Sequence, residues 1–172
     1  MRHGLFIVYT GNGKGKTSAA LGIVLRMIGR GMRACMLQFV KKKALRAAEN
    51  RFGEMMNVEI VGLGDGFTWM SDDLDKDRRL AREGWDHCLA RLQDPQYDAV
   101  ILDELTYPIS FGWIDVEEAL AAIRKRPEGM HVVITGRDAH PALIEAADLV
   151  TEMVEVKHPF HKGVPPQKGI DV

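Results

Sequence analysis

The stretch GNGKGKTSAA, Gly11 to Ala20, follows a short apolar run and leads into a segment with helical spacing. In such a stretch glycines let backbone N–H groups turn toward a bound anion, a lysine reaches phosphate oxygens, and a Ser/Thr hydroxyl at the helix start suits Mg²⁺. These places are taken by Gly13, Gly15, Lys16 and Thr17. Thr10 stands where the usual pattern has a further glycine. The flanking segments nevertheless favour a phosphate-binding loop over a glycine-rich surface turn.

The remaining sequence alternates between segments typical of strands and segments typical of helices. Apolar runs bounded by turn residues predict strands at 5–9, 34–39, 58–63, 99–102, 131–135 and 149–156. Helices are predicted at 17–30, 73–92 and 115–126, and a short one from Pro141. The stretches 40–56 and 62–72 are expected to be irregular, and the tail from Lys157 to be extended. Nearly continuous hydrophobicity indicates strands buried on both faces, so we expect an α/β fold with a mainly parallel central sheet flanked by helices.

The composition is that of an ordinary globular protein. The chain has 172 residues, 46% of them apolar and 27% charged, with a formal net charge of −1. That length suits one domain, and the charge lacks the basic excess of nucleic-acid binders. No apolar run approaches the roughly 18 residues of a membrane span, and the N-terminal run is too short for a signal peptide. Cys35 and Cys88 have no paired spacing and indicate reduced thiols. We therefore expect a cytoplasmic protein that binds neither nucleic acid nor membrane.

Two acidic residues end a predicted strand in the stretch AVILDE, at 99–104. Either Asp103 or Glu104 could hold Mg²⁺, because this hard cation keeps several waters and takes only one or two protein carboxylates. In a hydrolase Glu104 would instead activate a water molecule as general base. A strand-end acid that merely caps a loop is the plain structural alternative.

Other candidate residues lie in loops that follow strands. Arg137, after HVVIT, either clamps a phosphate with its planar guanidinium or is solvated. Phe67 and Trp69, in GDGFTWM, either fill the core or offer a flat apolar wall to a large ligand. His158 and His161 lack a third ligand in their segment and make a poor metal site.

Taken together, these motifs resemble the P-loop type of ATP:corrinoid adenosyltransferases, also called cob(I)alamin adenosyltransferases. The resemblance runs over nearly the whole chain, through TGNGKGKTSAALG (10–22), LQF with a following lysine (37–41), GFTW (66–69), LDELTY (102–107), VITGR (133–137), ADLVTEM (147–153) and KHPF to QKGID (157–171). A generic ATPase shares the first of these motifs but not GFTW or DELTY.

The resemblance implies a P-loop NTPase-like three-layer fold, a single adenosyltransferase domain over residues 1–172, and a homodimer. It implies that the 5′-deoxyadenosyl group of ATP is transferred to the Co(I) centre of a reduced corrinoid, giving adenosylcobalamin or a precursor. Intact triphosphate leaves, with the γ-phosphate held where other P-loop proteins hold the α-phosphate. Mg²⁺, or Mn²⁺ in its place, would assist, and a flavoprotein reductase would supply electrons.

The family's functional residues carry over position by position. The ATP-binding residues would be Gly11, Asn12, Gly13, Lys14, Gly15, Lys16, Thr17 and Arg137. Metal ligands would be Thr17 and Glu104, and the catalytic set Lys16, Thr17 and Glu104. Phe67 and Trp69 match the aromatic residues that displace the corrinoid's lower nitrogen ligand and leave cobalt four-coordinate.

Two departures from the family pattern and two rival functions remain. Many relatives have an N-terminal basic arm over the corrinoid, whereas this sequence begins at its first strand, so closure is expected either to be looser or to depend on other loops. After the second strand, VKKKALRAAENRFGE replaces a glycine-containing stretch with a Gly-Glu pair. The rivals are a P-loop NTP hydrolase with Glu104 as general base and a carrier that binds both ligands without turnover.

Overall fold

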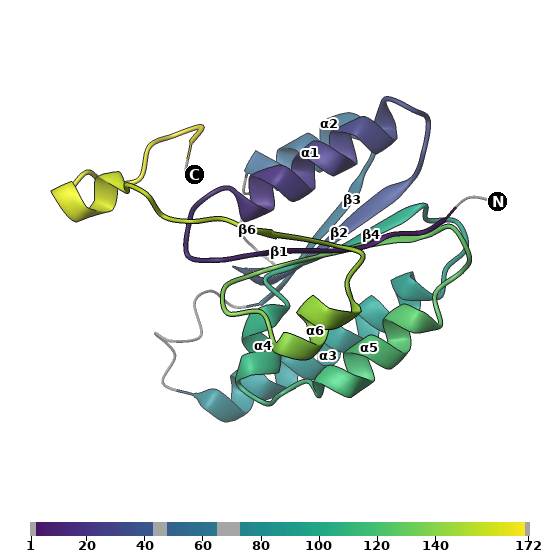
Figure 1. The fold of residues 1–172 in the computed structure, drawn as a ribbon. Coiled ribbons are helices and arrows are strands. Elements are labelled where there is room, and N and C mark those ends of the chain that lie inside the picture. The colour runs from purple at the N-terminus through teal and green to yellow at the C-terminus, as the bar shows by residue number, and fades with distance from the viewer. Residues whose placement is uncertain (1–2, 43–47, 65–72, 171–172) are drawn as a thin grey trace.

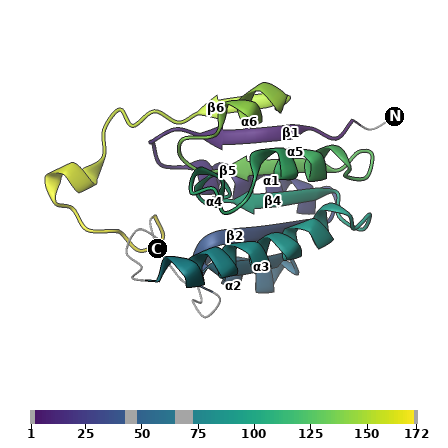
Figure 2. The same cartoon turned by 90° about the horizontal axis from the view of Figure 1, so that it is seen from below.

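A six-stranded parallel sheet forms the centre of the protein. The computed structural model describes residues 3–42, 48–64 and 73–170. The strands are β1 (Phe6–Thr10), β2 (Ala34–Lys42), β3 (Glu59–Gly64), β4 (Ala99–Asp103), β5 (His131–Thr135) and β6 (Leu149–Glu152). They lie in the order β3-β2-β4-β5-β1-β6, as Figure 2 shows from below. Every pair of described strands is parallel. This confirms the expected sheet, which was predicted to be mainly parallel.

Helices cover both faces of the sheet, as expected. They are α1 (Lys16–Ile28), α2 (Ala48–Met56), α3 (Leu74–Leu92), α4 (Thr106–Ser110), α5 (Val116–Arg124) and α6 (Pro141–Ala146). Figure 1 shows α1 and α2 on one face and α3 to α6 on the other. The three-layer α/β architecture predicted from the alternating segments is therefore confirmed.

The two faces of the sheet bury separate apolar clusters. Alternate strand residues point to opposite faces, so β2 sends Leu37 toward α3 and Met36 toward α1. The larger cluster contains Trp85 and Cys88 of α3, both fully buried. Cys35 is also buried, and both cysteines are free thiols, as the sequence predicts. Among the described helices, none has the length and apolar character needed to cross a bilayer.

Three elements differ from the prediction, each for an identifiable reason. Part of the stretch expected to be irregular, 40–56, forms α2, whose mid-helix Gly53 lowers its intrinsic propensity but whose Phe52 packs on the cluster beneath α1. β6 ends at Glu152 and not at residue 156, because its neighbour β1 ends opposite it at Thr10. The short helix α4 was not expected from TYPIS, where Pro108 is tolerated because it lies in the first turn.

The carboxyl ends of the strands meet at one edge of the sheet, on the left in Figure 1. The phosphate-loop motif follows β1 there, Glu104 follows β4 and Arg137 follows β5. Ligands of open α/β sheets bind at this edge. Beyond β6, the described part of the tail, up to residue 170, has the 3₁₀ turn η2 (Pro159–Lys162) and otherwise no helix or strand, which agrees with the expected extended segment.

Candidate active site

The loop between β1 and α1 is held against the end of β6. Gly11 adopts a φ of 91°, a left-handed conformation that favours glycine. It therefore makes the turn for which the usual phosphate-loop pattern has a glycine one position earlier, where this chain has Thr10. Gly13 donates its backbone N–H to the Met153 carbonyl at 2.6 Å. The Thr10 hydroxyl, in place of the missing glycine, accepts from the Ala139 N–H at 3.1 Å. Thr10 thus fastens β1 to the segment after β5.

Lys16 lies folded over this loop. Its Nζ donates to the carbonyls of Gly11 and Gly13 at 2.7 and 2.8 Å, and the residue is 7% exposed. Burial lowers the pKa of Lys16, whereas the nearby Glu104 carboxylate acts in the opposite direction. The ammonium is therefore poorly hydrated and surrounded by backbone carbonyls, so an incoming phosphate would offer it a stronger, charged partner.

Asp103 is the centre of a buried hydrogen-bond network. Its Oδ1 accepts from the Thr17 and Thr135 hydroxyls at 2.9 and 2.7 Å, and its Oδ2 accepts from the Gln38 amide at 3.1 Å. Burial raises the pKa of Asp103, and these hydrogen bonds oppose that rise. Because Thr17 donates its proton to Asp103, the lone pairs of its hydroxyl oxygen face away from the carboxylate.

Glu104, the next residue, is held in a different way. Its backbone has a φ of 61°, unusual for a residue other than glycine, and its N–H donates to the Thr135 hydroxyl at 3.0 Å. Its Oε2 is buried and has no hydrogen-bond partner among the residues that the structure describes. Burial, followed by repulsion from Asp103, raises the pKa of Glu104 to about 7. Of the two acids that the sequence left as alternatives, only Glu104 has an oxygen available to a ligand.

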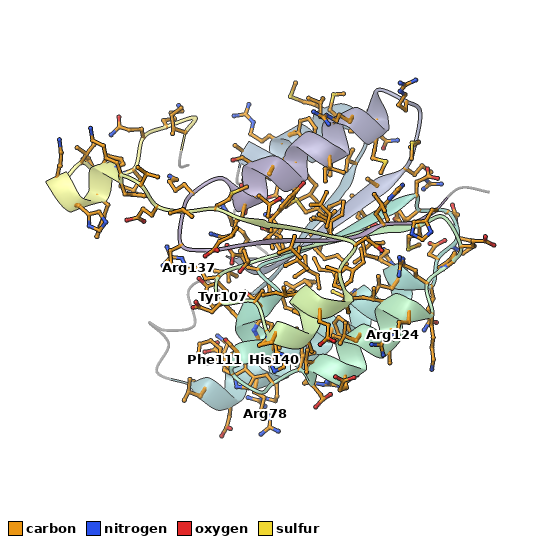
Figure 3. The ribbon with its side chains drawn as sticks, viewed as in Figure 1. Arg78, Tyr107, Phe111, Arg124, Arg137 and His140 are labelled. Atoms are coloured by element: carbon orange, nitrogen blue, oxygen red, sulfur yellow. The ribbon has the colours of Figure 1, made fainter. Side chains whose placement is uncertain are left out.

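One cavity of about 330 Å³ brings most of the predicted residues together. Its lining includes the continuous stretch Asn12 to Thr17, as well as Glu104 and Arg137. Gly11, in the same loop, is not part of this lining, but its carbonyl accepts a hydrogen bond from the Lys16 Nζ. Figure 3 shows Arg137, which is exposed, beside Tyr107 at this edge, and both line the cavity. The cavity is lined by the glycine-containing loop and by several basic side chains, which suits a polyphosphate.

The structure adds Tyr107 and Glu49, which sequence reasoning did not assign to the site, and places beside them Lys41, from the basic run 41–43 that is either a solvated patch or an attraction for polyanions. Tyr107, Lys41 and Glu49 line the same cavity, and the Lys41 Nζ lies 3.4 Å from the Glu49 carboxylate. Glu49 lies in the first turn of α2, the helix that the sequence analysis did not predict. Gln38 supports Asp103 from beneath. Tyr107 could have been found from the LDELTY motif. Glu49 could not, because its place beside the cavity depends on α2, which was not predicted.

Two sets of sequence candidates do not enter this geometry. Phe67 and Trp69 lie outside the described residues. His158 and His161 lie in the exposed tail, where His161 pairs with Glu155 at 2.5 Å. Within the described part of the chain, no cluster of three or more His, Cys, Asp or Glu residues could hold a metal.

Comparisons with known proteins agree with this site. Residues 2–172 match the family described as ATP:corrinoid adenosyltransferase BtuR/CobO/CobP. A corrinoid adenosyltransferase of Pseudomonas aeruginosa is 42% identical over 171 residues, covering 98% of this chain and 83% of that protein. The chain belongs to the ATP:corrinoid adenosyltransferase family. The corrinoid adenosyltransferase of Escherichia coli K12 is similar as well, with 41% identity over 98% of this chain and 85% of its own length.

Structural comparison agrees on the fold of this corrinoid adenosyltransferase. The flagellar accessory protein FlaH from Methanocaldococcus jannaschii matches it with a TM-score of 0.55 and 10% identity, covering 88% of this chain and 72% of FlaH. At this identity the likeness concerns the fold alone, and it agrees with the expected P-loop NTPase-like class. As a family member, the chain is an enzyme that transfers an adenosyl group from ATP to a corrinoid.

Proposed function

We propose that this enzyme transfers the 5′-deoxyadenosyl group of ATP to the Co(I) centre of a reduced corrinoid and releases intact triphosphate. The observation that carries the proposal is the cavity lined by Asn12 to Thr17, in which a polyphosphate would meet backbone amides, Lys16 and Glu104 together. We further propose that residues 1–172 act as one adenosyltransferase domain.

The phosphate loop would grip the leaving group. As the bond from carbon 5′ to oxygen breaks, negative charge grows on the triphosphate, and donors already aimed at it stabilise the transition state. Lys16 would exchange its two backbone carbonyls for phosphate oxygens, with the α1 N-terminus adding further N–H donors. Arg137, exposed at the mouth of the cavity, would hold the outer part of the nucleotide.

The residues present fit a divalent cation beside this loop. The buried Glu104 Oε2, unpaired among the described residues, is an oxygen ligand of the kind that Mg²⁺ prefers, and Mn²⁺ accepts the same ligands. Thr17 would contribute its hydroxyl lone pair while still donating to Asp103. When bound, the cation would supply positive charge to the departing triphosphate. Asp103 would position Thr17 and leave direct coordination to Glu104.

The protein itself need not provide a nucleophile. Co(I) is a very strong nucleophile, so no activated Ser, Cys or His is needed. Both cysteines are buried in the core. Catalysis then consists of holding carbon 5′ in line with cobalt and stabilising the leaving group. Phe67 and Trp69 are proposed, from the family resemblance, to displace the lower ligand of the corrinoid.

We also propose the cellular setting that the family resemblance implies. A flavoprotein reductase would reduce the corrinoid, the enzyme would act as a homodimer, and both would work in the cytoplasm. Two free, buried thiols are compatible with a reducing compartment.

The strongest rival function is nucleotide hydrolysis. A pKa of about 7 for Glu104 is near the value that suits a general base at neutral pH, which favours this alternative more than the sequence did. A hydrolase would release phosphate from ATP without corrinoid, whereas the transferase releases triphosphate only when reduced corrinoid is present.

One assay separates these functions. The enzyme is incubated with ATP, Mg²⁺, cobalamin and a strong chemical reductant, and the phosphate products are resolved while the Co(I) absorption is followed. We expect loss of the Co(I) band, a light-sensitive Co–C product and an equal amount of triphosphate. Orthophosphate released without corrinoid would establish the hydrolase, and binding of both ligands without product would establish a carrier.

A further inference from the structure

The segment that follows β6, residues 154–170, is here called the C-terminal strap, and it touches the nucleotide site at both ends. Just before its start, the Met153 carbonyl accepts the Gly13 N–H of the phosphate loop at 2.6 Å. At its far end, Ile170 lines the nucleotide cavity. Figure 1 shows the strap, in yellow, looping outward from β6 and returning toward the start of α1. Residues 159–170 are all exposed, so the strap crosses solvent between these two contacts.

A mostly apolar groove lies beside the nucleotide cavity, between α1 and α2. Its volume is about 470 Å³. Leu21 and Leu25 of α1 and Phe52 of α2 line it, and Leu25 is 55% exposed. Leu21 and Ile170 line both the groove and the nucleotide cavity, so the two adjoin each other. Ile170 therefore stands where one side chain reaches both the groove and a bound nucleotide.

A tight turn presents Ile170 at this point. The Ile170 N–H donates to the Gln167 carbonyl at 3.1 Å, and Gly169 has a φ of 80°, as glycine does at the third position of such a turn. Ile170 is nevertheless 78% exposed. Burying a large apolar side chain against an apolar wall is favourable, so moving Ile170 deeper into the groove would gain free energy. The described conformation leaves this contact largely unmade.

The strap also carries positive charge that a polyphosphate attracts. Its one acidic side chain, Glu155, is paired with His161 at 2.5 Å. Its basic residues include three lysines, Lys157, Lys162 and Lys168. Lys168 directly precedes Gly169 in the turn at the cavity. A triphosphate bound in the cavity would therefore draw the turn inward by long-range attraction.

We propose that the strap is a nucleotide-dependent latch. When ATP fills the cavity, the turn at 167–170 moves inward, Ile170 seats itself in the groove between α1 and α2, and the strap closes over the nucleotide. Closure slows the escape of ATP and excludes water from the triphosphate. The inference rests on the proposed function in one respect, the placing of ATP in the cavity lined by Asn12 to Thr17.

Limited proteolysis of the full chain tests closure directly. Trypsin cleaves after lysine, and the bond between Lys168 and Gly169 lies within the turn. We expect saturating ATP and Mg²⁺ to slow cleavage at this bond about 10-fold, because a closed turn does not enter the protease. Cleavage after Lys125, exposed at the end of α5, is the reference, and mass spectrometry resolves the products. Equal cleavage at Lys168 with and without bound ATP would overturn the latch.

Two aliphatic truncations separate the latch from direct contact with ATP. Leu25 lines the groove but not the nucleotide cavity, whereas Ile170 lines both. We expect Leu25→Ala and Ile170→Ala each to raise the dissociation rate of ATP about 10-fold, since each removes part of the same apolar contact. The double variant should be no faster than either single one, because the two residues act together. Stopped-flow displacement of a fluorescent ATP analogue measures the rate.

Two further variants serve as controls. Val156→Ala is a matched truncation in the same strap, at a residue that is 91% exposed and lines neither cavity, so its dissociation rate should equal that of the wild type. Ile170→Leu keeps an aliphatic side chain of the same size and should keep slow dissociation.

The outcomes keep this inference apart from the proposed function. If Leu25→Ala leaves the dissociation rate unchanged while Ile170→Ala raises it, Ile170 only touches the nucleotide, and the latch is wrong. If the latch behaves as expected but reduced corrinoid and ATP yield no triphosphate, the closure stands and the proposed transfer to cobalt fails.

Discussion

At the scale of single residues, Lys16 has the largest expected effect on catalysis. Lys16→Ala removes the ammonium folded over the phosphate loop, so charge on the departing triphosphate loses a preorganised donor. We expect kcat/KM to fall by a factor corresponding to about 3 kcal/mol, the usual cost of one such donor. Steady-state adenosylation kinetics measure the effect. Lys125→Ala, exposed at the end of α5, should be unchanged, and equal losses in the two variants would contradict the role of Lys16.

Glu104 should make the stability of the free protein depend on pH. Because burial raises its pKa to about 7, the folded state holds its proton more tightly than the unfolded state does. The stabilisation from this proton is present below the unfolded pKa and is lost as pH rises through about 7. Glu104→Gln removes this pH-dependent loss. The difference in free energy of unfolding between the variant and the wild type should therefore shift in favour of the variant by about 2 kcal/mol from pH 5 to pH 8.

Denaturant unfolding at the two pH values, without nucleotide or metal, measures this difference. Glu145→Gln, an exposed substitution on α6, controls for general charge effects and should show no such dependence. If Glu104→Gln changes the free energy of unfolding equally at both pH values, the carboxylate is not desolvated as the structure indicates.

At the scale of secondary-structure elements, the phosphate loop depends on its contact with the end of β6. A Cβ added to Gly13 would lie 2.7 Å from the Met153 carbonyl oxygen, so Gly13→Ala must push the loop away from β6. We expect ATP affinity to fall at least 10-fold, or about 1.4 kcal/mol, as measured by calorimetry.

Gly22→Ala is the matched control within α1. Its Cβ would meet nothing within 4 Å, and alanine has the higher helix propensity, so the variant should be more stable by about 1 kcal/mol and should bind ATP normally. Equal ATP affinities for Gly13→Ala and Gly22→Ala would show that the contact with Met153 does not shape the loop.

Element prediction from sequence succeeded where the local pattern was strong. The runs that became β4 and β5 are continuously apolar because helices cover both of their faces, and their predicted bounds agree with the structure to within one residue. Helix α2 was missed because Gly53 lies at its centre and glycine is a weak helix former, although most of its other residues favour a helix. Phe52, packed against the cluster beneath α1, supplies the tertiary contact that favours it.

At the scale of the whole molecule, nucleotide binding should stabilise the folded state. The cavity is built from segments after β1, β2, β4 and β5, so a ligand that fills it links four parts of the fold. With ATP and Mg²⁺ at about 100 times Kd, linkage predicts about 2.7 kcal/mol of added stability, or a rise in Tm of roughly 5–10 °C for a chain of this size. Differential scanning fluorimetry without corrinoid measures it.

The same measurement on Lys16→Ala provides the control, since a weaker grip on the triphosphate should shrink the shift at equal ATP concentration. Omitting Mg²⁺ should shrink it as well, given the proposed ligands Thr17 and Glu104. An undiminished shift without Mg²⁺ would argue against a metal in the nucleotide complex.

The amino-acid sequence alone determined the parallel α/β fold, the phosphate loop and the family, because apolar runs, glycine spacing and helix signals act between residues close along the chain. It left open which acid at the end of β4 faces the ligand, since that depends on partners brought together only by folding. Thr17 and Asp103 are 86 positions apart, and Gln38 and Asp103 are 65 apart, yet their hydrogen bonds occupy Asp103 and leave Glu104 available.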